Sequence, residues 1–174
     1  MASTLKINNL DTASGTTITL PTGKTLVGTD EGAFRVPGTI LQVVQTTTTS
    51  QNNTTSTSFV DTGLSATITP KSSSSKILVM ADYTCTANNS SNGMISRLVR
   101  GSTALFTRGV SYASSGGTYG VDSFSHLDSP STTSATTYKV QFTTQGSSTQ
   151  VQFAVHYSGY TSPMAHMTLV EIAG

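Results

Sequence analysis

The residues best suited to chemistry are few and widely separated along the chain. His126 and Asp128 stand two positions apart, so on one strand their side chains would share a face, and with a third ligand they could hold a metal ion. The alternative, which we favour, is an ordinary polar pair at a strand end or an interface. The carboxylates are too scattered to nominate a pair for glycoside hydrolysis: Asp61, Asp82, Asp122, Asp128 and Glu171. We therefore expect no metal site and no cofactor.

Catalytic motifs are missing from the sequence as well. It contains no Gly-x-Ser-x-Gly elbow, no His-Glu-x-x-His and no phosphate-binding glycine loop. We expect a protein that is not an enzyme, although a small hydrolase of host polysaccharide is a further alternative. Tyr112 and Tyr119 fall in the segment "SYASSGGTYG", which we expect to be an exposed loop. Tyrosines among small residues offer rigid contact area, so these two are candidates for a host contact.

The composition points to an all-β protein that binds neither nucleic acid nor membranes. Thr and Ser number 33 and 26 of the 174 residues, and Thr favours strands while Ser favours turns. Charged residues make up only 10% and the net charge is +1, which argues against a surface for nucleic acid or anionic lipid. No apolar run of about 18 residues suggests membrane insertion. Cys85 is the single cysteine, and we expect it to be buried.

Alternating apolar residues predict about eight strands after Pro37-Gly38. The nine candidate ranges from which this count is drawn are 39–47, 58–69, 76–82, 94–100, 103–107, 121–128, 138–143, 150–157 and 164–172. Between them we expect long loops at 45–58 and 111–120. The stretch "KILVMAD" (76–82) is apolar on both faces, as in a strand that lies between two layers. We predict an antiparallel jelly-roll-like sandwich, with another Greek-key sandwich as the alternative.

The residues before Pro37-Gly38 read as an extended N-terminal arm. We therefore divide the chain into an arm, 1–37, and a β-sandwich domain, 38–174. The arm has too few apolar residues to fold on itself, so we expect them to be buried only in an assembly. The candidate assembly contacts are Leu5, Ile7, Ile18, Leu20, Leu26, Val27 and Phe34.

Several stretches resemble one class of viral protein. They are "STLKINNLDTASGTTITLPTG", "VPGTILQVVQ", "SFVDTGLSATITPKSSSSKILVMADY" and "RLVRGSTALF". They are similar to the short fibre and surface-appendage (decoration) proteins of tailed bacteriophages, particularly phages of marine and freshwater bacteria. The likeness spans most of the chain, but this chain ends at Gly174 without the shaft or lectin-like tip of longer relatives.

The resemblance implies a non-enzymatic virion protein made in the host cytoplasm and carried on the outer surface of the particle. It also implies a homotrimer whose arm attaches to capsid or tail proteins while the β-domain faces outward. Both a short tail fibre and a capsid decoration protein fit this description. The alternative is a receptor- or glycan-binding tip that mediates host adsorption.

Overall fold

A computed structural model of the chain describes residues 21–25, 27–28, 36–88, 92–111, 118–146, 149–155 and 165–174. The strands are β1 (Ile40–Thr48), β2 (Asn52–Thr54), β3 (Val60–Ile68), β4 (Lys76–Ala87), β5 (Met94–Arg100), β6 (Thr103–Ser111), β7 (Thr118–Asp128), β8 (Thr136–Thr144), β9 (Val151–Phe153) and β10 (Ala165–Ile172). Within these residues there is no helix that is long and apolar enough to cross a membrane.

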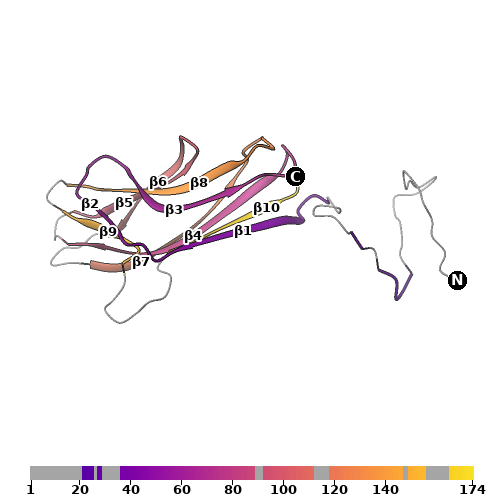
Figure 1. Cartoon of the computed structure of the whole chain (residues 1–174), viewed down its shortest axis with the longest axis horizontal. Helices are drawn as coiled ribbons and strands as arrows, with labels where there is room; N and C mark the ends of the chain where they lie inside the picture. The colour runs from indigo at the N-terminus through magenta and orange to yellow at the C-terminus, as the bar shows by residue number, and fades with distance from the viewer. Residues whose placement is uncertain are drawn as a thin grey trace.

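The strands form two antiparallel sheets, which lie one above the other in Figure 1. The β4 sheet contains β1, β10, β4 and β7 in that order, with β9 and β2 beside them. The β8 sheet has the order β3-β8-β5-β6. Successive side chains on a strand point to opposite faces, so each strand contributes one set of residues to the space between the sheets.

Two pairs of short strands act as single long ones. β10 pairs with residues 76–83 of β4, and β9 pairs with residues 85–87 of the same strand. β7 occupies the other side of β4 along 77–87, so β9 and β10 lie end to end on one side. In the same way β1 runs beside β10, and β2 beside β9.

Counted as eight long strands in chain order, the sheets read 1-8-3-6 and 2-7-4-5. This is the strand order of a jelly roll, in which two Greek keys build a double sheet. The predicted fold class is therefore confirmed.

The core between the sheets is apolar and aromatic. Tyr83 and Phe153 place their ring centroids 4.7 Å apart, and Phe142 lies 6.1 Å from Phe153. Cys85 is buried, as predicted from the sequence. The inward positions of β4 alternate strictly: Ile77, Val79, Ala81, Tyr83, Cys85 and Ala87.

Some predicted boundaries were wrong, and pairing explains why. The expected loop at 45–58 is shortened because β1 continues to Thr48 against β10 and β2 pairs with β9. Threonine suits a pleated strand, so a Thr-rich run can extend one where a partner is present. The expected loop at 111–120 likewise begins after β6 ends at Ser111, and β7 starts at Thr118.

The predicted strand at 150–157 is also shorter in the structure. Its strand part is Val151–Phe153, because Ala154 takes a left-handed conformation with φ 54° and leaves the ladder. The backbone N–H of Ala154 still donates to the carbonyl of Thr84 at 2.9 Å.

Candidate interaction surface

An uninterrupted row of apolar side chains crosses the outer face of the β4 sheet. It consists of Val43 on β1, Val170 on β10, Leu78 on β4 and Leu127 on β7, which we call the apolar band. Val43 pairs with Val170, Val170 with Leu78, and Leu78 with Leu127. Paired positions on one face bring their side chains within contact distance, so the band spans the full width of the sheet.

The band is open to solvent at both ends. Val43 is 58% exposed and Leu127 is 51% exposed, whereas Val170 in the middle is covered by its neighbours. The next row toward the N-terminal end of β1 adds Ile40, which pairs with Ile172. Toward the other end of the sheet the face becomes polar, with Gln45, Thr168 and Ser125 on three of its strands. The band is therefore narrow.

A shallow hollow adjoins the band between β4 and β7. It has a volume of about 400 Å³ and is lined by Met80, Ala81, Asp82, Ser123, Phe124 and Ser125. Met80, itself 38% exposed, lies one row from Leu78 and forms part of its wall. The outer face thus offers an apolar row and a small depression beside it, features suited to side chains of another polypeptide.

The outer face also corrects our interpretation of 76–82 as a strand between two layers. Only one side of β4 is covered by the β8 sheet, and Leu78 and Met80 point away from it. The sequence pattern of a strand buried on both faces is therefore present, but the described residues of a single chain cover one face alone.

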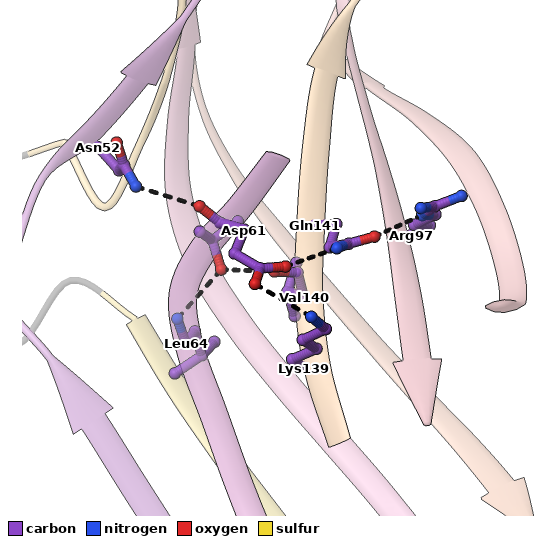
Figure 2. A network of polar contacts seen from close by, with 8 residues as sticks. Asn52, Asp61, Leu64, Arg97, Lys139, Val140 and Gln141 are labelled. Carbon is purple, nitrogen blue, oxygen red and sulfur yellow. Dashed lines mark hydrogen bonds and ion pairs between the residues drawn. The ribbon is translucent and has the colours of Figure 1, made fainter. Parts of the chain in front are cut away.

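The opposite outer face, on the β8 sheet, is polar and internally paired. Figure 2 shows Asp61 on β3 between Lys139 and Gln141 on β8. Lys139 Nζ lies 3.0 Å from Asp61 Oδ2, and Gln141 Nε2 donates to Asp61 Oδ1 at 2.5 Å. Arg97 Nε donates to Gln141 Oε1 at 2.8 Å, and the Arg97 guanidinium lies 4.0 Å from the centre of the Phe59 ring. This face presents charge where the β4 sheet presents apolar surface.

The network favours the ionised form of Asp61. The hydrogen bond from Gln141, helped by Lys139, lowers the pKa of Asp61 below its ordinary value. Because this carboxylate is largely exposed, its ion pair adds little to stability. Its effect is on the character of the surface, which stays charged and hydrated across the neutral pH range.

A second group of polar contacts ties the two sheets together along the β7 edge. Arg108 on β6 forms an ion pair with Asp122, and the Tyr83 hydroxyl also donates to this carboxylate. Burial, together with Asp122, raises the pKa of Tyr83, so the hydroxyl remains a hydrogen-bond donor. These contacts connect the layers where their apolar packing ends.

His126 and Asp128 share the inner face of β7, as predicted, but they do not act as a pair. Asp128 accepts hydrogen bonds from Arg100 Nη1 at 2.7 and 2.9 Å and from the Tyr138 hydroxyl at 2.7 Å. The His126 ring instead lies 5.4 Å from the Phe106 ring. No group of three or more His, Cys, Asp or Glu in the described ranges could hold a metal ion.

The point where the arm joins the sandwich lies beside the band. The N–H of Gly38 donates to the carbonyl of Ala173 at 2.7 Å, which fixes the chain entry next to the C-terminus. Val36 is 59% exposed and Ile40 is 64% exposed. Exposed apolar side chains are therefore present also at the residues that lead into the arm.

Most of the predicted site residues lie outside the described part of the chain. This applies to Leu5, Ile7, Ile18, Leu20, Leu26, Phe34 and Tyr112. Val27 is described and is 73% exposed. Tyr119, near the start of β7, is 61% exposed and lies on the same outer face as the band, beyond its polar half. A host contact through the tyrosines stays a prediction.

Sequence reasoning missed the band itself. Its members come from four strands that are distant in the chain, so only the sheet order brings them together. One signal was available: the run 76–82 is apolar on both faces although the chain supplies only enough strands for two layers.

Comparison with known proteins assigns the chain to no family. No protein-family model and no curated protein matches the chain. Among solved structures, it is similar to a chain in the structure of infectious bursal disease virus Gx strain, with a TM-score of 0.38 and 15% sequence identity. That match covers 76% of this chain and 36% of the viral one.

Proposed function

We propose that the protein is a non-enzymatic structural component of a bacteriophage virion. In this proposal it is a homotrimeric appendage on the outer surface of the particle, either a short tail fibre or a capsid decoration protein. Residues 1–37 attach it to capsid or tail proteins and to sister chains. The sequence resemblance to phage appendage proteins motivates this assignment.

The observation that carries the proposal is the apolar row on the outer face of the β4 sheet, which is open to solvent at both ends. Val43 and Leu127 are each more than half exposed, although apolar residues make up only 35% of the chain. Contiguous exposed apolar surface marks sites of association in soluble proteins. The charged β8-sheet face suits the side that meets solvent.

The engagement of the carboxylates supports a structural role over a hydrolytic one. Asp61, Asp122 and Asp128 each accept hydrogen bonds or ion pairs from side chains of the same chain. Glu171 accepts hydrogen bonds from Gln42 and from a backbone N–H. A general acid or a nucleophile would have to face a substrate site instead.

The proposal is tested by removing residues 1–37 and following both assembly and decoration. We expect the truncated chain to keep the circular dichroism of a β-sandwich but to lose incorporation into phage particles, scored by electron microscopy of labelled protein. A subtler pair of full-length variants controls for the deletion. Ile18→Ser with Leu20→Ser should weaken incorporation, whereas Thr17→Ser with Thr19→Ser should not. Normal decoration by the truncated chain would refute attachment through the arm.

A further inference from the structure

The apolar band needs a cover, and its shape favours one extended segment over a second sheet. It is a single row, and beyond it the outer face carries polar residues such as Gln45, Thr168 and Asp82 among a few exposed apolar ones, Met80, Tyr119 and Val121. Two sheets packed face to face would bring these polar groups together in a dry interface, at a cost in desolvation. A single strand laid across the sheet would cover the band and leave the polar half in water.

The dimensions suit such a segment. Strands lie about 4.8 Å apart, so the row from β1 to β7 is roughly 14 Å long. Along an extended chain, alternate side chains recur about every 6.7 Å, so two or three of them fit over the row. The N-terminal arm contains two stretches of this kind, Leu5 with Ile7 and Ile18 with Leu20.

The position of the arm makes it available to another copy of the chain. The arm joins the sandwich at Val36, beside Ile40 and the edge of the band. Fully extended, 35 residues reach at most roughly 120 Å, which is several times the width of the sheet. The described arm residues leave their apolar side chains uncovered, since Val27 is 73% exposed.

From these observations we infer that the apolar band is the receiving site for the N-terminal arm of a neighbouring copy of this chain. The alternating apolar residues of the arm, Leu5 with Ile7 or Ile18 with Leu20, lie across Val43, Val170, Leu78 and Leu127. The arm then becomes the missing second cover of β4, which accounts for the two-sided apolar pattern of 76–82. The inference rests on the proposed homotrimer and names the surface that holds it together.

The test is photo-cross-linking in the full-length protein. A photoreactive benzoylphenylalanine replaces Ile7 in one sample and Ile18 in another, each prepared as an equal mixture of isotopically heavy and light chains. We expect cross-links in at least one of them between heavy and light chains, on peptides from β1, β4 and β7 that contain Val43, Leu78 or Leu127. The reciprocal probe at position 127 should mark residues 1–20 of another chain.

Two further variants are compared, one that disrupts the band and one that serves as its matched control. Val43→Asn with Leu127→Asn should lower the yield of inter-chain cross-links at least fivefold, because it places amides in the band. Val121→Asn should leave the yield unchanged, since Val121 is 76% exposed on the same strand and face but lies outside the band. Circular dichroism verifies that all variants fold.

Each other outcome has a distinct meaning. Cross-links within single chains would show that the band is covered by the arm of the same chain. Cross-links from position 127 to strands of another copy would show face-to-face packing of two sheets. Either result overturns the inference. Cross-links elsewhere in a protein that sediments as a trimer overturn the inference and leave the proposed function intact. A full-length protein that sediments as a monomer would defeat the homotrimer and the inference together.

Discussion

At the scale of single residues, Glu171 is the least expected feature of the molecule. Its side chain is fully buried, which is rare for a carboxylate. Gln42 Nε2 donates to one carboxylate oxygen at 2.5 Å, and the backbone N–H of Lys71 donates to the other at 2.6 Å. Burial alone would raise the pKa of Glu171, but the hydrogen bonds outweigh it and lower the pKa below its ordinary value.

This shift predicts a specific loss of stability in acid. A carboxyl whose pKa is lowered on folding stabilises the protein above its unfolded pKa, near 4.5, and that contribution disappears as the pH falls through the folded pKa. Glu171→Gln should destabilise the protein at pH 7 by about 1–3 kcal/mol, because the amide turns a donor toward another donor. It should also flatten the pH profile below pH 4.5, measured by urea unfolding.

The control for Glu171 is Asp82→Asn, an exposed carboxylate on the outer face of β4. It should leave both the stability at pH 7 and the acid profile close to those of the parent protein. Acid profiles of equal slope for the parent and Glu171→Gln would contradict the assigned role.

Sequence alone could not identify this residue, because a lone Glu near the chain end resembles any surface carboxylate until Gln42 and Lys71 are placed beside it.

At the scale of elements, β3 shows how the sheet edge is shaped. Its pairing with β8 is irregular between Asp61 and Ser65, and Gly63 there has a φ of 87°. The Thr62 hydroxyl donates to the carbonyl of Val140 at 2.8 Å and accepts the N–H of Leu64 at 3.1 Å, which holds the bulge in place. Glycine is suited to this position because other residues are strained at positive φ.

We expect Gly63→Ala to destabilise the protein by about 1–2 kcal/mol through backbone strain. Space is not the cause, since a Cβ at Gly63 would meet no atom within 4 Å. Gly109→Ala on β6 is the matched control, because its Cβ would also be unobstructed and its backbone has no left-handed φ. It should be neutral or slightly stabilising in urea unfolding. Similar losses in both variants would argue against strain at the bulge.

The strands themselves were largely predictable, whereas their limits and order were not. Alternation located β3 through Leu64, Ala66 and Ile68, because one face of an antiparallel strand is buried. The split of the last long strand was not visible, since Val155 continues the alternation of Val151 and Phe153 although the chain has left the ladder at Ala154. A backbone turn inside an apolar pattern leaves no mark on that pattern.

At the scale of the whole molecule, the sandwich has two unlike outer faces. One carries the apolar band, and the other carries the network of Asp61, Lys139, Gln141 and Arg97. The sequence predicted two sheets but not this difference. Residues of one face are scattered over the chain, so their common character depends on the jelly-roll order of the strands.

The difference between the faces predicts unequal lysine reactivity in the assembled protein. Lys76 is exposed in the single chain and lies one row from the band, so a bound arm should slow its acetylation severalfold. Lys139, on the charged face, should react at the same rate whether or not the arm is docked. Mass spectrometry of the parent protein and of a full-length variant with Ile7→Ser, Ile18→Ser and Leu20→Ser compares the two states. An unchanged rate at Lys76 would contradict coverage of this face.

The division between β9 and β10 has a consequence for how such a protein can diversify. β4 pairs with Phe153 at Cys85 and with Ala165 at Tyr83, and between these pairs Thr84 is bonded to the backbone of Ala154 and Val155. The registers of β9 and β10 are therefore each fixed by their own contacts with β4. Sequence added between Val155 and Ala165 would enter at the middle of a central strand while these contacts hold the two strands in place.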